Sequence, residues 1–382
     1  MDLEFNDEQL ELRETVRAAL ARECPPHLVR SVAGGGPGAD ALATAVAWLG
    51  WPALTVDVDL GGLGRSFVEL AIVLEGMGRA AAPGAYLPTM TQFVPAVREV
   101  GTPAQAHRFL SAVAAGEVTG TLALHEGGRW DPDTVVATAQ RDGDGWLLQG
   151  TKHHVLGAPD VDEVVVAARR DTGSLGLFVV PAAELSFART ASLDPTRSLA
   201  RVDLDGVWVP DARVLGGPDA DVDAGKAIGR VVTEAVVGLA LDALGACDAL
   251  IEASLEVALQ GGVAGQATEH ALADMVVAAD LARAATYQAT AAVASGDASA
   301  PLAASVAKAA VGECQRLVTR TAVEVCGGTT GPDGLPLDLW VGRAEADALL
   351  FGSAADHRRI VADHLLVAQR ARHAQLSHAL VG

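Results

Sequence analysis

The sequence predicts an α+β fold in which a helical N-terminal domain, a small β domain and a C-terminal helical bundle follow one another. Apolar residues recur at helical spacing up to about residue 115, and short runs rich in Val and Leu fill residues 118–216. Helical spacing then returns after Pro218. The expected domains are residues 1–116, 117–217 and 218–382.

In the N-terminal part, the stretch NDEQLELRETVRAALARE predicts a helix with Asn6 as its N-cap and with Glu8 and Gln9 in its first turn. The glycine-rich segment DVDLGGLGRS is expected to form a loop that leads into another helix. The helices expected after the first one cover residues 40–49, 66–79 and 104–115.

In the middle part, six short apolar runs are separated by the turn signals RDGDG, DTGS and DPTRS. This spacing predicts a small antiparallel sheet domain, either a barrel or a sandwich. Five long helical patterns follow, at 222–258, 265–296, 301–326, 337–350 and 353–378. These patterns predict a C-terminal helical bundle.

The composition excludes several classes of function. With 28 Lys and Arg against 48 Asp and Glu, the formal charge is −20, and no basic cluster is present, so we expect neither nucleic acid nor a membrane surface as a partner. The apolar tracts are shorter than the about 20 residues that cross a bilayer. We therefore expect a cytoplasmic protein. The four cysteines form no CxxC pair and have no histidine at ligand spacing, so no metal site is expected.

Several segments resemble the acyl-CoA dehydrogenase family, in the family's order and at compatible spacings. They are LEFNDEQLELRETVRAALARE, DVDLGGLGRSFVELAIVLEGMGRAAAPGAYLPT, GQATEHALADM, VEVCGGTTGPDGLP and HRRIVADHL. The resemblance implies a flavoprotein fold with an antiparallel β-barrel middle domain and a four-helix C-terminal domain. It further implies FAD as cofactor and an acyl-CoA substrate oxidised at Cα–Cβ. It also implies a dimer of dimers, with electron-transfer flavoprotein as a candidate electron acceptor.

The same resemblance indicates that the catalytic base is missing. Removal of the α-proton of a thioester requires a base close to that carbon, and the family uses the Glu of an E-G-T loop. Reading without gaps from Pro336 places Phe351 at this Glu, followed by Gly352 and Ser353. Some members carry the base on the first helix of the C-terminal domain, where Glu234 is a substitute candidate; the competing interpretation is an acid paired within the bundle.

The positions that the resemblance assigns to the flavin are also altered. The family's T-E-P-x-A-G-S-D loop reads HEGGRWD here, and Leu156 replaces the hydroxyl that donates to flavin N5. The R-x-x-F-G segment, whose Arg meets the FAD of a neighbouring subunit, reads LEVAL. The degenerate cofactor positions are His125, Glu126, Gly128, His154, Leu156, Glu324, Gly327, Gly328, Gly352 and Ser353.

Three histidines offer acid or base chemistry near neutral pH, against the alternative that they line the rim of a lost cofactor site. Because side chains alternate along a strand, His153 and His154 should point to opposite faces, so at most one of them shares a pocket with His125. Trp130 either stacks on a ring ligand or closes a domain interface. Three acids near the base loop are expected in surface ion pairs: Glu345, Asp347 and Asp356.

These features favour an accessory subunit of a heteromeric, FAD-dependent acyl-CoA dehydrogenase for fatty acid or sterol side-chain degradation. A homologous sister chain would carry the base and an intact flavin site. Two alternatives stay open. One is a self-sufficient enzyme with a relocated base such as Glu234, or with histidines that act on acyl-CoA without flavin. The other is an acyl-CoA-binding pseudoenzyme.

Overall fold

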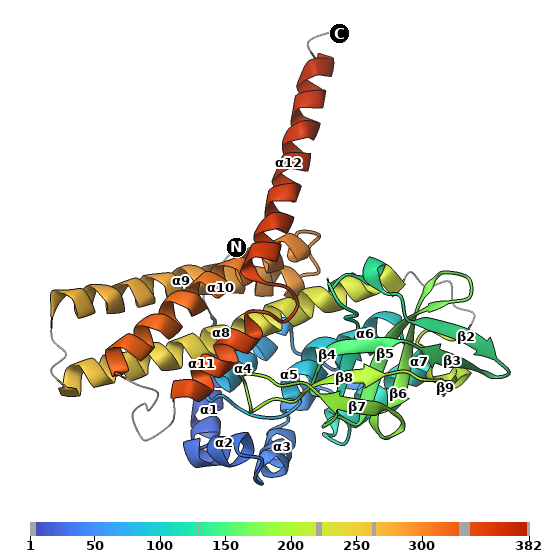
Figure 1. The fold of residues 1–382 in the computed structure, drawn as a ribbon, viewed down its shortest axis with the longest axis horizontal. Helices are drawn as coiled ribbons and strands as arrows, with labels where there is room; N and C mark the ends of the chain where they lie inside the picture. The colour runs from blue at the N-terminus through green and yellow to red at the C-terminus, as the bar shows by residue number, and fades with distance from the viewer. Residues whose placement is uncertain (1–4, 129, 219–223, 262–264, 328–336, 380–382) are drawn as a thin grey trace.

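The computed structural model describes residues 5–128, 130–218, 224–261, 265–327 and 337–379. An N-terminal group of helices, a middle β domain and a C-terminal group of long helices follow in the predicted order, which confirms the α+β fold class (Figure 1). Within the described residues, no helix has the length and apolar character needed to span a bilayer.

The N-terminal helices bury their apolar sides against one another and against the first long C-terminal helix. As predicted, Asn6 caps the first helix, since its side chain accepts from the Gln9 amide at 2.9 Å and the Gln9 side chain accepts from the Asn6 amide. The helices are α1 (Asp7–Glu23), α2 (Pro26–Ala33), α3 (Ala39–Trp48), α4 (Phe67–Arg79), α5 (Tyr86–Pro88), a π-helical turn (Thr89–Phe93), α6 (Val94–Val100) and α7 (Pro103–Ala114).

The middle domain consists of two sheets. The strands are β1 (Gly120–Ala123), β2 (Thr138–Asp142), β3 (Gly145–Gln149), β4 (Thr151–Leu156), β5 (Glu163–Arg170), β6 (Leu175–Pro181), β7 (Ser186–Arg189), β8 (Leu199–Asp203) and β9 (Val207–Pro210). The larger sheet has the order β1-β5-β2-β3-β9, with β6 paired to β5, and the smaller one has the order β4-β8-β7.

Two pairings differ from the all-antiparallel barrel that we expected. β5 pairs in parallel with both β1 and β2, so the larger sheet is mixed. A parallel pair needs a long connection between its strands, and β2, β3 and β4 lie between β1 and β5 in the sequence. Short turn signals indicate hairpins but not these distant pairings.

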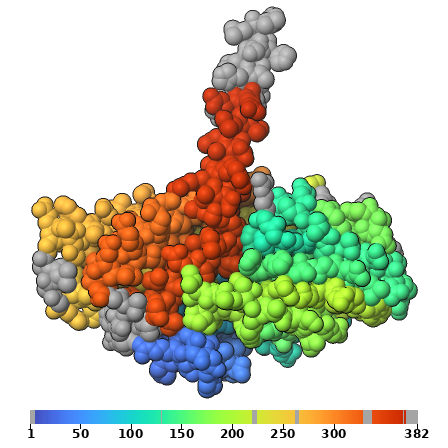
Figure 2. Space-filling model, in the orientation of Figure 1, coloured from blue at the N-terminus to red at the C-terminus, as the bar shows by residue number. Residues whose placement is uncertain are grey.

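The C-terminal domain contains α8 (Ala224–Gly261), α9 (Gln266–Ala294), α10 (Ala300–Cys326), α11 (Leu337–Asp347) and α12 (Ala354–Ala379). α8, α9 and α10 pack together, and α11 lies against α8 and α10. The first part of α12 contacts α10. The rest of α12 projects away from the body, as the ribbon (Figure 1) and the space-filling view (Figure 2) show.

The middle domain touches the C-terminal domain closely at Gly342 of α11. A Cβ added there would lie 2.2 Å from the backbone oxygen of Leu193, in the loop between β7 and β8. This approach brings the β7–β8 loop beside the end of α11, and so helps to form the cavity described next.

Candidate functional site

A cavity of about 520 Å³ lies between the middle and C-terminal domains. The segment after β1, strand β4, the β7–β8 loop, the end of α11 and the start of α12 all contribute to it. Its lining includes most of the predicted site positions, from segments far apart in the sequence: His125, Gly128, His154, Leu156, Gly352 and Ser353.

Phe351 lies in the tight turn between α11 and α12, as expected from the break between the helical patterns at 337–350 and 353–378. It is 4% exposed and has a left-handed backbone with φ of 56°. Gly352 follows with φ of 103°, a conformation that favours glycine. The turn is held by a contact of 3.0 Å between His357 Nε2 and the Phe351 carbonyl oxygen, and Ser353 caps α12 through Asp356.

The Phe351 ring belongs to an aromatic stack. Its centroid lies 4.1 Å from the ring of Trp130 at an interplanar angle of 27°, and Trp130 lies 4.7 Å from His125 at 29°. A base must approach the proton that it removes to hydrogen-bond distance. Because Trp130 is already in van der Waals contact with Phe351, no substrate carbon fits between these rings. The stack therefore fills the space in front of the position at which the family's base is expected.

His154 lies beside His125 on the cavity wall, while His153 is absent from the residues that line it. The two Nδ1 atoms of His125 and His154 are 3.3 Å apart. β4 has a register irregularity between Lys152 and Val155, and His154 has φ of 53° within it. The expectation that only one of the two adjacent histidines shares a pocket with His125 agrees with this arrangement.

The pKa values of His125 and His154 both lie below the ordinary histidine value. Burial is the main cause for each, and the neighbouring histidine rings add to it. Both rings are therefore neutral at pH 7. One neutral ring can donate its Nδ1 proton to the other, so the short contact is a hydrogen bond.

Glu126 is not among the residues that line the cavity. Its carboxylate forms an ion pair with the fully buried Lys152 and accepts from the backbone amides of Val136 and Ala137. Burial lowers the pKa of Lys152 to about 8. No local sequence pattern indicates this pair, because the two residues lie on different segments.

Several described residues depart from the FAD site that the family resemblance implies. Leu156 offers no hydrogen bond to a flavin nitrogen, and Glu324 is exposed on α10, 3.7 Å from Arg320. Four carboxyl groups line the cavity together with Arg197, and three of them are paired with arginines, whereas Glu345 is exposed. The paired acids are Asp194, Asp347 and Asp356. Gly327 ends α10 in a left-handed conformation, and Gly328 lies outside the described residues.

Glu234 faces a different cavity, of about 570 Å³, between α6, α8 and the turn from α9 to α10. It is 7% exposed and forms an ion pair with Arg98 of α6. Burial raises the pKa of Glu234, while Arg98 acts in the opposite direction. This agrees with the interpretation of a paired acid in the bundle and puts Glu234 away from the cavity that His154 and Gly352 line.

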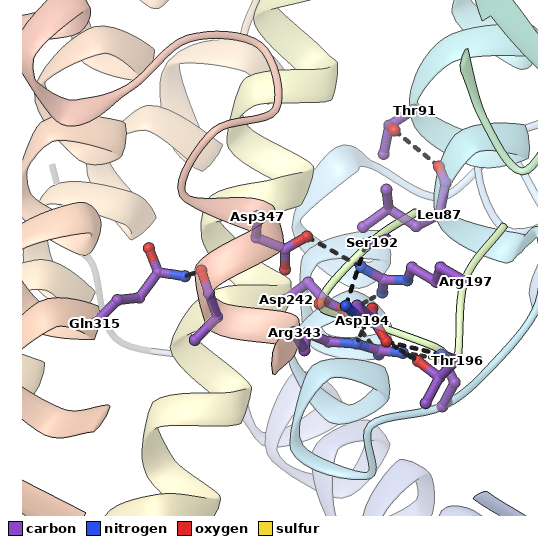
Figure 3. A network of polar contacts seen from close by, with 12 residues as sticks. Leu87, Thr91, Ser192, Asp194, Thr196, Arg197, Asp242, Gln315, Arg343 and Asp347 are labelled. Carbon is purple, nitrogen blue, oxygen red and sulfur yellow. Dashed lines mark hydrogen bonds and ion pairs between the residues drawn. The ribbon is translucent and has the colours of Figure 1, made fainter. Parts of the chain in front are cut away.

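A buried charge network joins the two domains beside the first cavity (Figure 3). Arg343 of α11 contacts Asp194 at 3.1 Å and Thr196, both in the β7–β8 loop. Arg197 of the same loop bonds Asp242 of α8 and lies 3.3 Å from Asp347. The network fixes the β7–β8 loop against α8 and α11.

Asp347 was expected on the surface, and that expectation is wrong: it is 1% exposed. Burial and the nearby Asp242 carboxyl raise its pKa. Its compensating cation, Arg197, lies 150 positions away in the sequence, so local spacing could not indicate the pairing. Asp356, in contrast, forms the expected surface ion pair with Arg359, and Glu345 is exposed.

Comparison with known proteins agrees with this fold. Residues 6–117 match the acyl-CoA dehydrogenase N-terminal domain, and residues 227–366 match the acyl-CoA dehydrogenase C-terminal domain. The chain is 26% identical over 341 residues to the mitochondrial short-chain specific acyl-CoA dehydrogenase of Bos taurus, covering 84% of this chain and 81% of that protein. It is 29% identical to the acyl-CoA dehydrogenase FadE12 of Mycobacterium tuberculosis, covering 82% and 83%.

A solved structure of a variant of the Tcur3481-Tcur3483 steroid ACAD is also similar. It superposes with a TM-score of 0.81 at 26% identity, over 96% of this chain and 99% of that one. The order of domains, the two family matches and these relatives lead to one conclusion: the chain belongs to the acyl-CoA dehydrogenase family.

Proposed function

We propose that this chain is the accessory subunit of a heteromeric, FAD-dependent acyl-CoA dehydrogenase. The complex would oxidise acyl-CoA thioesters at Cα–Cβ in fatty acid or sterol side-chain degradation. One observation carries the proposal: Phe351, at the position where the resemblance places the base, is buried and stacks on Trp130. An apolar ring cannot accept a proton. The stacked Trp130 ring also prevents a substrate from approaching the face of Phe351 that it covers.

A homologous sister chain supplies what this chain lacks. It carries the carboxylate base and the flavin site, and FAD when bound accepts the hydride from the β-carbon. The similarity to a steroid ACAD named for two components supports a partner of this kind. The complex would be a cytoplasmic dimer of dimers, with electron-transfer flavoprotein as a candidate electron acceptor.

A self-sufficient enzyme with Glu234 as its base is less well supported. A base must lie close to the carbon that it deprotonates, whereas Glu234 lines another cavity and is already paired with Arg98. An acyl-CoA-binding pseudoenzyme is the remaining alternative, and the flavin content of the purified protein distinguishes it.

The test is purification of the chain alone and together with a homologous chain encoded beside it, followed by flavin absorption spectra. Flavin in the pair but not in the lone chain is expected. Flavin bound by the lone chain contradicts the proposal, and no flavin in either preparation favours the pseudoenzyme.

A matched pair of variants tests the base position. Phe351→Glu and Phe351→Leu are compared in the co-purified complex, with dehydrogenation of an acyl-CoA as the readout. Neither variant should raise the activity above that of the unchanged complex, because the working base belongs to the sister chain. A gain specific to Phe351→Glu would show that this chain has a functional flavin and substrate site.

A further inference from the structure

We propose that the cavity of about 570 Å³ that Glu234 lines, the second cavity, binds the anion of a monocarboxylic acid with an apolar body, such as a free fatty acid. Arg65 and Arg230 would hold the carboxylate, and the turn between α9 and α10 would cover the apolar body. This site goes beyond the proposed function, because it needs neither flavin nor a thioester. Of the described residues that line it, none lines the first cavity and none belongs to the middle domain.

The second cavity has a charged wall and an apolar wall. The charged wall consists of the end of α6, with Arg98 and Glu99, and the first part of α8, with Arg230 and Glu234. A ligand with a charge at one end and a hydrocarbon chain at the other matches both walls. The apolar wall comes from the end of α9 and the start of α10 and includes Val293, Ala294, Ala298, Ala300 and Pro301.

The acids that line the second cavity already have partners. Both glutamates of the charged wall accept from arginines of the same wall, Glu234 from Arg98 and Glu99 from Arg230. The third acid, Asp297, accepts from a backbone amide at 2.7 Å. A cationic ligand would therefore have to compete with one of these partners.

The arginines, in contrast, have donors to spare. A guanidinium carries five N–H groups. Within the described chain, Arg230 donates only through Nε, to Glu99. The nearest acid to Arg65 in the same part of the chain is Glu8, at 3.8 Å, which is too far for a hydrogen bond. Because donors exceed acceptors, the second cavity favours an anion, and arginine binds a carboxylate through two parallel hydrogen bonds.

The backbone holds Arg65 in place beside the second cavity. Its amide donates to the carbonyl oxygen of Leu54 at 2.7 Å. The loop before it is tightly packed, since a Cβ added at Gly62 would lie 1.9 Å from the backbone oxygen of Val56. The next residue, Ser66, caps α4. A cation on a fixed backbone loses less freedom when a ligand binds, which favours affinity.

The balance of charge favours a carboxylate over a phosphate. A carboxylate adds one negative charge, whereas a phosphate adds about two, and the acids of the wall oppose the larger charge more strongly. An inorganic ion also leaves the apolar wall unused. The charged side chains that line the second cavity are three arginines and three acids: Arg65, Arg98, Arg230, Glu99, Glu234 and Asp297.

The experiment titrates octanoate into the lone chain and follows binding by isothermal titration calorimetry. Octanol has the same chain without the charge, and inorganic phosphate has the charge without the chain, so both serve as control ligands. Octanoate should bind at one site, and each control should bind about 10-fold more weakly or worse, because it lacks one of the two contacts. The affinity for octanoate should fall as NaCl is added, since salt screens the arginines.

Two pairs of variants locate the site. Arg65→Gln should weaken octanoate binding about 10-fold or more, whereas Arg316→Gln, outside the cavity, should leave it unchanged. Ala298→Trp fills the apolar side of the second cavity and should abolish binding, whereas Leu349→Trp fills the first cavity and should not change it. All four side chains are exposed, so the variants should fold, and circular dichroism melting curves check this.

Four results would overturn the inference. They are no binding of octanoate, equal affinity for octanol, tighter binding of phosphate, and octanoate binding that survives Ala298→Trp. Failure of this inference is separate from failure of the proposed function. Octanoate binding is measured on the lone chain without flavin, whereas the accessory role is measured by flavin content in the co-purified pair.

Discussion

Replacing Phe351 by alanine should destabilise the chain by about 4 kcal/mol. A phenylalanine side chain buries about 150–250 Å², which at about 25 cal/mol per Å² corresponds to roughly 4–6 kcal/mol. Measured Phe-to-Ala replacements in cores cost about 3–5 kcal/mol. Phe351 is 4% exposed, so nearly the full amount applies.

Phe351→Leu serves as the matched control. Leucine keeps most of the apolar volume but loses the stacking on Trp130, which is worth about 0.5–1.5 kcal/mol beyond its area. The assay is guanidinium unfolding followed by circular dichroism, with amide hydrogen exchange of α11 and α12 to locate the effect. A loss below about 1 kcal/mol in Phe351→Ala would refute the claim that this ring fills the site.

Three further predictions test the surroundings of the cavity. Arg343→Met leaves buried carboxylates uncompensated and should lower the free energy of unfolding by about 3–5 kcal/mol. The control Arg359→Met, at the surface, should lower it by about 0–1 kcal/mol. Gly342→Ala forces a Cβ against a backbone oxygen at 2.2 Å and should destabilise by about 1–3 kcal/mol, while Gly229→Ala, where a Cβ meets nothing within 4 Å, should stabilise by about 0.5–1. Burial lowers the pKa of His357 below its ordinary 6.5. Just below that pH the unfolded chain therefore binds more protons than the folded chain, so the free energy of unfolding should fall on acidification. His357→Gln should flatten this pH dependence of the melting temperature.

Contradictory outcomes are equally definite. Equal losses in the two arginine variants would show that the buried network does not hold the domains together. A neutral Gly342→Ala would mean that α11 and the β7–β8 loop are not in close contact. An unchanged pH slope in His357→Gln would place the responsible protonation elsewhere.

The order of domains and the long helices were predictable because they depend on local patterns. Helical spacing over tens of residues, the capping pair of Asn6 and Gln9, and the turn at Phe351 are all local signals. The parallel pairing of β5 with β1 was not predictable, since it joins strands separated by three others.

The candidate site was predictable only in part. Positions such as His154 and Gly352 follow from the resemblance, and the cavity does bring them together. The stacking of Trp130 on Phe351 and the burial of Asp347 arise from contacts between domains. Such contacts depend on how separate segments pack, which no local sequence pattern records.

The most direct test of the accessory role is the FAD content of each purified preparation after incubation with excess FAD and removal of the unbound cofactor. If the chain is an accessory subunit, the lone chain retains no FAD and the pair with its homologous sister chain retains FAD. One FAD per lone chain would contradict the accessory role, since it would show that this chain holds a flavin without a partner.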